Sequence, residues 1–160
     1  MIYLIDGHNL IPKIPGLSLR ALDDEVRLIE LLQVFSRVRR SAVEVFFDGA
    51  PPGQAGTRRY GTVKAHFIRA GRTADDAIIA HLRTLGPRAG EISVVSSDHR
   101  VQAEARSLRA SLIESGNFAR DLLEAQVAAQ PGRMDRREAP LGAEEVDEWL
   151  KLFTDGKKSK

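Results

Sequence analysis

The chain has 160 residues, 42% hydrophobic and 29% charged, which suits one folded domain with a buried core and excludes a disordered or fibrous protein. Lys and Arg number 24 and Asp and Glu 22, and the resulting net charge of +2 is too small to identify a partner. There is no cysteine, which excludes disulfides, thiolate catalysis and cysteine-ligated metals. We therefore expect a reducing, cytoplasmic setting.

The opening residues, MIYLIDGHNL, contain no basic leader, and their apolar run stops at Asp6. This run is too short for a signal peptide or a membrane span, and no other stretch approaches the length of a membrane helix. We expect no membrane partner.

Along the chain, short apolar runs that end in turn residues alternate with segments of helical periodicity. The apolar runs predict strands at residues 2–5, 43–47, 63–68, 92–95 and 110–113. The helical spacing of apolar residues predicts helices at residues 22–38, 73–85, 101–108 and 118–129. The Gly- and Pro-rich residues 49–57 are expected to form a mobile loop that covers the site.

This alternation predicts βαβ units and hence a three-layer α/β/α sandwich with a mainly parallel sheet over residues 1–129. Residues 130–142 contain Pro, Gly and clustered charge, which predicts a surface connection. An amphipathic helix is expected at residues 143–153, packed on the domain or on a partner, before a frayed basic tail.

Three of the predicted strands are followed directly by an aspartate: Asp6, Asp48 and Asp98. In open α/β sheets, ligands bind beyond the carboxyl ends of the strands, so neighbouring parallel strands would bring these carboxylates to one edge. Each one alone is a common turn residue. Three together favour a shared site.

A fourth acid comes from the sequence Thr73-Ala74-Asp75-Asp76 at the start of a predicted helix. Thr73 and Asp76 have the spacing of a capping box, which accounts for Asp76 without any function. Asp75 lies on the helical stripe that must face the sheet, where a carboxylate is costly unless it is paired or binds a metal. We therefore add Asp75 to the cluster and keep Asp76 as a second choice.

Several crowded carboxylates repel one another unless cations neutralise them. Oxygen ligands without cysteine or a set of histidines favour Mg²⁺ or Mn²⁺ over Zn²⁺. A reaction that suits such a site is phosphoester hydrolysis, in which a metal lowers the pKa of the attacking water.

No acid occurs between residues 49 and 74, whereas this stretch carries several cations and the interleaved aromatic rings of Tyr60, His66 and Phe67. Cations beside a metal site suit a polyanionic substrate, and aromatic rings could stack on unpaired bases. A solvated basic face is the alternative interpretation. The candidate RNA-binding residues are Arg58, Arg59, Lys64, Arg69 and Arg72.

Four segments resemble, in order and spacing, the NYN domain of the YacP-like ribonucleases, a branch of the PIN-like nucleases. They are residues 2–10 (IYLIDGHNL), 43–49 (VEVFFDG), 73–78 (TADDAI) and 94–98 (VVSSD). The closing EEVDEWLKLF is similar to that family's C-terminal helix. His8 and His99 depart from the resemblance, because an aromatic such as Tyr is expected at both places.

The resemblance implies a PIN-like sandwich with a Mg²⁺- or Mn²⁺-dependent site that cuts single-stranded RNA internally. Members of this branch are associated with mRNA decay and translation, so a ribosome-bound message is an implied substrate. Matched motif by motif, the implied catalytic residues are Asp6, Asn9, Asp75 and Asp98. The candidate metal ligands are Asp6, Asp48, Asp75, Asp76 and Asp98.

Two other functions remain open from the sequence. One is an RNA- or ribosome-binding adaptor with little catalysis, which the basic segment and the Trp149 helix would serve. The other is a small-molecule phosphohydrolase that uses the same metal site, although the first strand lacks the DxD of the common aspartyl-phosphate type.

Overall fold

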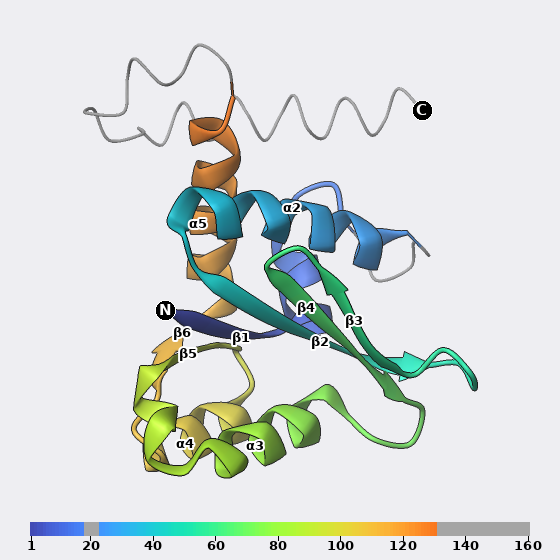
Figure 1. Cartoon of the computed structure of the whole chain (residues 1–160), viewed down its shortest axis with the longest axis vertical. Helices are drawn as coiled ribbons and strands as arrows, with labels where there is room; N and C mark the ends of the chain where they lie inside the picture. Colours follow the sequence, from blue (N-terminus) through green and yellow to red (C-terminus); the bar gives the residue numbers. More distant parts are fainter. Residues whose placement is uncertain (18–22, 131–160) are drawn as a thin grey trace.

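The structure is a computed structural model that describes residues 1–17 and 23–130. A six-stranded sheet lies between two layers of helices (Figure 1). The strands are β1 Ile2–Asp6, β2 Ala42–Ala50, β3 Gly56–Tyr60, β4 Val63–Arg69, β5 Ile92–Val95 and β6 Ser111–Ile113. The helices are α1 Gly7–Leu10, η1 Ile11–Lys13, α2 Asp24–Arg39, α3 Ala74–Leu85, η2 Gly86–Glu91, α4 His99–Ser107 and α5 Ser115–Ala128.

The sheet order is β3-β4-β2-β1-β5-β6, and every neighbouring pair is parallel except β3 with β4. From β1 the chain moves outward to β2 and β4, and it then returns to pair β5 with the other edge of β1. The strand order therefore reverses beside β1. In α/β sheets such a reversal opens a crevice at the carboxyl ends of the strands, which is the usual place for a ligand.

Alternate residues of the strands build two separate cores. Ile5 and Val45 face the layer formed by α1, η1, α2 and α5, whereas Leu4 and Phe46 face α3 and α4. In Figure 1, α2 and α5 accordingly lie on one side of the sheet and α3 and α4 on the other. The apolar runs of β1, β2 and β5 are those expected of strands that are covered on both faces.

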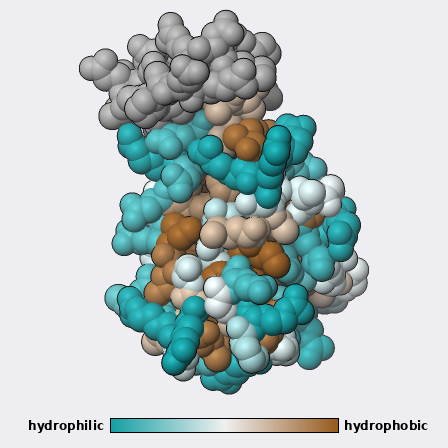
Figure 2. All heavy atoms as spheres, turned by 60° about the vertical axis from the view of Figure 1, so that its left-hand side comes forward, coloured by the Kyte–Doolittle hydropathy of each residue, from teal (hydrophilic) through white to brown (hydrophobic). Residues whose placement is uncertain are grey.

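The burial of apolar side chains is nearly complete in the described part of the chain. Met1 and Val26 are its only large hydrophobic residues that are exposed. Viewed from the left-hand side of Figure 1, the surface shows separate hydrophobic patches among hydrophilic side chains (Figure 2). None of the described helices is long and apolar enough to cross a membrane.

All five predicted strands and all four predicted helices within residues 1–130 are confirmed, with shifts of a few residues at their ends. The expected loop at residues 49–57 is wrong at both ends, because β2 continues to Ala50 and β3 begins at Gly56. Strand β3 (GTRRY) has no apolar alternation, since it is an exposed edge strand held by its pairing with β4. The expected helix at residues 143–153 lies outside the described residues.

A polar contact between layers lies on the α3 side of the sheet. Glu44 of β2 accepts a hydrogen bond from His66 Nε2 of β4 (2.7 Å), and His81 Nε2 of α3 lies 3.7 Å from its other oxygen. The ring of Phe46 stacks on His66 with centroids 4.5 Å apart. The hydrogen bond from His66, followed by that from His81, holds the pKa of the half-buried Glu44 carboxyl well below its ordinary value.

This contact predicts a dependence of stability on acid pH. Because the folded pKa of Glu44 is below 4.5, its contribution is fully present above pH 4.5 and is lost as the pH falls through the folded pKa. In urea unfolding at a series of pH values from about 6 to about 3, the free energy of unfolding should fall less for Glu44→Gln than for the wild type. The exposed Glu30 supplies the control, and equal profiles for Glu44→Gln and Glu30→Gln would contradict the assignment.

Candidate active site

The acid cluster, defined here as Asp6, Asp75 and Asp98, lies at the carboxyl end of the sheet, and each member stands at the start of a helix. Asp6 ends β1 and caps α1 by accepting a hydrogen bond from the Asn9 amide (3.3 Å). Asp98 follows β5 and caps α4 by accepting from the amides of Arg100 (2.9 Å) and Val101 (3.1 Å). Asp75 is in the first turn of α3.

Asp75 links the other two acids, because its carboxyl group is hydrogen-bonded to both Asp6 and Asp98. The cluster is shielded from water mainly at Asp6, which is only 7% exposed. The structure therefore brings together three of the five acids that the sequence predicted, and it places them where the strand order reverses.

Burial and like charge make these carboxyl groups hard to ionise together. The pKa of Asp6 is raised to about 7, mainly by burial and then by the hydrogen bond and the charge of Asp75. Burial and the charge of Asp98 also raise the pKa of Asp75. Without a cation, the Asp6–Asp75 pair is therefore stabilised by a proton that the two groups share.

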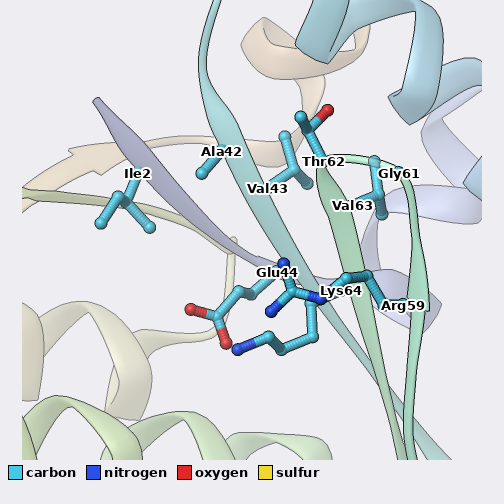
Figure 3. A pocket seen from close by; sticks show the side chains of 9 residues that line it. All are labelled: Ile2, Ala42, Val43, Glu44, Arg59, Gly61, Thr62, Val63 and Lys64. Carbon is cyan, nitrogen blue, oxygen red and sulfur yellow. The ribbon is translucent and has the colours of Figure 1, made fainter.

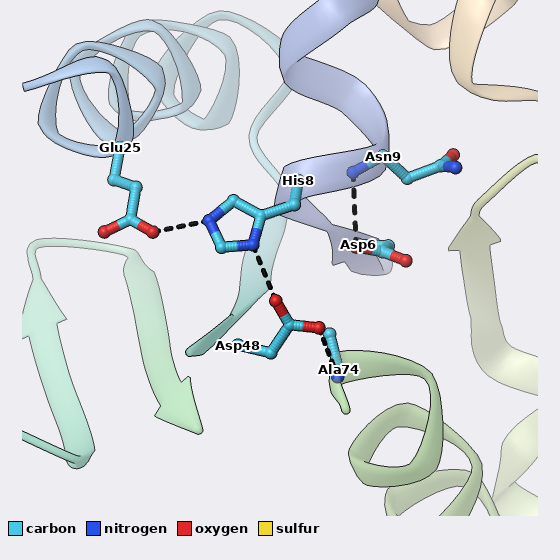
Figure 4. A network of polar contacts seen from close by, with 6 residues as sticks. All are labelled: Asp6, His8, Asn9, Glu25, Asp48 and Ala74. Atoms are coloured by element: carbon cyan, nitrogen blue, oxygen red, sulfur yellow. Dashed lines mark hydrogen bonds and ion pairs between the residues drawn. The ribbon is translucent and has the colours of Figure 1, made fainter. Parts of the chain in front are cut away.

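Asp48 lies at the same end of the sheet, where its carboxylate contacts a histidine and the first turn of α3. Its Oδ1 lies 2.8 Å from His8 Nδ1, and its Oδ2 accepts a hydrogen bond from the Ala74 amide at the start of α3 (3.1 Å; Figure 4). His8 Nε2 in turn contacts Glu25 of α2 at 2.5 Å. Asp48 thus ties β2 to the helix that carries Asp75, and it acts on Asp6 only through its charge.

His8 connects the two helical layers around this end of the sheet. Its imidazole lies between the carboxylates of Glu25 and Asp48 (Figure 4). The hydrogen bond to Glu25, supported by that to Asp48, raises the pKa of His8 to about 9 against the opposing effect of burial. The imidazole is therefore positively charged at neutral pH, and it compensates two acids beside the cluster.

Asp76 is turned away from the cluster. It is exposed, forms a 2.5 Å ion pair with Arg100, and its amide donates to the hydroxyl of Thr73, the N-cap of α3. The Arg100 hydrogen bond lowers its pKa. The capping interpretation of Thr73 is confirmed, and a role of Asp76 as a metal ligand stays a prediction.

Asn9 holds the segment that carries Asp98. Its side-chain oxygen accepts hydrogen bonds from the Ser97 amide (2.9 Å) and from the hydroxyl of Ser115 at the start of α5. The Ser97 hydroxyl accepts from the Ser115 amide (3.2 Å). Asn9, predicted as catalytic, is seen here in contacts that position β1, the end of β5 and α5 relative to one another.

The predicted RNA-binding cations are divided between the two faces of the β3–β4 pair. Arg58 lies over the Phe67 ring, 4.7 Å from its centroid, on the α2 side, and strand alternation places Arg69 there too. Arg59 and Lys64 are register partners on the α3 side, as Lys64 also is with Glu44. Arg72 is exposed between β4 and α3.

The aromatic rings of this segment are not free platforms for bases. Tyr60 and Phe67 pack against the α2-side core, and His66 is stacked on Phe46. His99, the first residue of α4, is exposed.

Several positioning residues were not singled out from the sequence. The partners of Glu25 and Ser115 lie 17 and 106 residues away along the chain, so no local pattern identifies these two residues.

The donor chemistry of the acid cluster fits Mg²⁺ or Mn²⁺. Within residues 1–17 and 23–130, no group of three or more His, Asp or Glu side chains is arranged so that it could hold a metal ion. Mg²⁺ does not need one, because it commonly takes one or two carboxylates and keeps several waters for exchange with phosphate oxygens. Asp6 and Asp75 supply such a pair, and their pKa values are raised first by burial and then by neighbouring acids, two effects that a bound cation would offset.

The fold and this site define a class of proteins: three-layer α/β domains with a carboxylate cluster at the carboxyl edge of a mainly parallel sheet. A family model described as the YacP-like NYN domain matches residues 3–153. The chain belongs to this family, which is of nuclease type and has RNA-related function.

Solved structures agree with this fold. Rae1 (YacP) from Bacillus subtilis is 22% identical, with a TM-score of 0.67 over 99% of this chain and 91% of that one. Its W164L mutant gives the same identity and TM-score, with 98% of that chain covered. No curated protein sequence matches the chain significantly.

Gly7 predicts a packing constraint next to the acid cluster. A Cβ at this position would lie 2.3 Å from Phe47 Cε1 and 3.1 Å from the Phe46 carbonyl oxygen. Because Phe47 is buried and cannot yield freely, Gly7→Ala should lower the free energy of unfolding by about 1–3 kcal/mol in urea denaturation. Gly90→Ala, whose Cβ would meet only Arg109 O at 3.8 Å, should change it by less than about 0.5 kcal/mol.

The hydrogen bonds of Asn9 predict a second effect on stability. Asn9→Ala leaves the Ser97 amide and the Ser115 hydroxyl without their acceptor, which should cost about 1–3 kcal/mol. Asn117→Ala, an exposed asparagine of α5, is the control in the same urea titration. Equal stabilities of the two variants would show that Asn9 does not hold the Asp98 segment.

Proposed function

We propose that this protein is a Mg²⁺- or Mn²⁺-dependent endoribonuclease that hydrolyses phosphodiester bonds in single-stranded RNA, including messages on the ribosome. The observation that carries the proposal is the hydrogen-bonded cluster of Asp6, Asp75 and Asp98. Membership of a nuclease-type family with RNA-related function supports both hydrolysis and the choice of RNA.

Asp6 and Asp75 are the residues that would hold the metal, and Asp98 would orient Asp75 through their hydrogen bond. When bound, the metal would supply a water of lowered pKa and stabilise the charge on the reacting phosphate. The chain itself fixes the acids: Asn9 holds the Asp98 segment, and Asp48 holds the first turn of α3.

Positive charge near the cluster favours an RNA strand over a small neutral substrate. Arg69 and Arg72 flank the turn between β4 and α3, directly before Asp75, and both are exposed. Phosphate contacts of this kind contribute most of the sequence-independent affinity for nucleic acids. Cytoplasmic RNA is the substrate pool that we propose, in keeping with a chain that has no cysteine.

The proposal is tested by cleavage of a circular single-stranded RNA, which has no ends for an exonuclease. With Mn²⁺ or Mg²⁺ the wild type should open the circle, and Asp75→Asn should be slower by at least about 100-fold, because a ligand is lost. Asp121→Asn, an exposed acid of α5, should cleave like the wild type. Equal cleavage by Asp75→Asn and the wild type would contradict the proposed site.

If the wild type binds metal but leaves free RNA intact, the same comparison is made with message on stalled ribosomes. Cleavage there, lost in Asp75→Asn, would support the ribosomal substrate. RNA binding without cleavage in either setting would favour the adaptor function and overturn the nuclease.

A further inference from the structure

A pocket of about 180 Å³ opens at the opposite end of the sheet from the acid cluster. It lies at the amino ends of β1, β2 and β4, and the residues that line it include Ile2, Ala42, Val43 and Val63 (Figure 3). The charged side chains of Glu44, Arg59 and Lys64 gather at its rim.

The charge of this pocket is positive. Arg59 and Lys64 form no ion pair with any residue in the described part of the chain, so their charges are available to a ligand. Glu44 is the one acid that lines the pocket, and its two oxygens are already engaged by His66 and His81. Because Glu44 is already paired whereas Arg59 and Lys64 are not, the pocket favours a negatively charged ligand.

The size of the pocket favours part of a polymer over a whole small molecule. Its volume equals that of about six waters at ~30 Å³ each. Pockets for complete small ligands usually measure about 300–1,000 Å³. One phosphate group with its waters fits this space, and Arg and Lys are the side chains that bind phosphate best.

Among the described residues, polar side chains of β3 and β4 lie on the α3 side of the sheet between the pocket and the acid cluster. On the α3 side of the sheet, α3 packs against β1 and β2, whereas the described helix that packs most on β4 is α2, on the other face. This α3-side strip carries Arg59 and Thr57 of β3 and Lys64 and His66 of β4, and His66 is only partly exposed because it stacks on Phe46. It leads along β4 to Arg72 and then to the first turn of α3 with Asp75.

We propose that Arg59 and Lys64 form a phosphate-binding subsite for the RNA strand, and that the α3-side strip of β3 and β4 guides this strand from the pocket to the acid cluster. This subsite rests on the proposed function, because it assumes that the substrate is RNA. It adds a second contact with the RNA, at a distance from the acid cluster. From Lys64 to the carboxyl end of β4 the strip is five residues long, or about 17 Å, which a stacked strand spans with on the order of five nucleotides. RNAs shorter than this would contact the acid cluster but not the subsite.

The test is RNA binding by the full chain in the presence of a metal chelator, so that its result does not depend on cleavage. Fluorescence anisotropy compares the wild type with Arg59→Gln/Lys64→Gln over a graded series of single-stranded oligonucleotides. Arg37→Gln/Arg106→Gln is the control, because it removes the same charge from exposed positions on α2 and α4. Circular dichroism confirms that all three proteins are folded.

For long oligonucleotides we expect about fivefold weaker binding by the pocket variant at 0.1 M salt, since one lost phosphate contact removes ~0.7 from the slope of log affinity against log salt. The control variant should bind almost like the wild type, and the shortest oligonucleotides should not distinguish the proteins. Equal losses in both variants, or a loss that does not depend on RNA length, would overturn the subsite.

A competition experiment with inorganic phosphate shows whether the pocket binds a phosphate group of the RNA or a free phosphate ion. Competition by phosphate for long RNA, absent in the pocket variant, would support a phosphate group of the RNA in the pocket. Phosphate binding that requires Arg59 and Lys64 while RNA affinity is the same in both proteins would assign the pocket to a free anion and overturn the RNA subsite. If the proposed nuclease activity were wrong, the cleavage assay with metal would leave the RNA intact, while the binding assay would still show normal RNA affinity.

Discussion

The buried carboxyl group of Asp6 is the constraint on which the arrangement of this site depends. A carboxylate at the end of the central strand β1 loses most of its hydration, and two further acids raise the cost of its charge. The chain keeps this costly group where the strand order reverses and where the N-termini of α1, α3 and α4 meet. Helix N-termini favour negative charge, which partly offsets the repulsion.

Around Asp6, other polar groups fix the segments that bring acids to it. Asn9 accepts hydrogen bonds from the Asp98 segment and from α5, while Asp48 holds the start of α3 and is itself held by the charged His8. These contacts join both helical layers to the central strands. The result is a set of carboxylates that is held in place before any cation or substrate arrives, which is the condition for efficient electrostatic catalysis.

The sequence allowed the parallel sheet and the acid cluster to be predicted because both depend on local patterns: apolar runs that end in Asp, and a capped helix that starts with Asp75. It did not predict strand β3, whose exposed GTRRY carries no apolar signal, or the bridge from His8 to Glu25, which depends on tertiary packing. The five cations looked like one basic segment, yet strand alternation divides them between two faces. That division leaves Arg59 and Lys64 at a pocket of their own.

The most direct test of the acid cluster is a calorimetric titration of the full chain with Mn²⁺. The account predicts saturable binding by the wild type and by Asp121→Asn, and strongly weakened binding by Asp6→Asn and by Asp75→Asn, all measured on proteins that remain folded. Absence of binding by the wild type, or equal binding by all four proteins, would contradict the claim that Asp6 and Asp75 hold a divalent metal.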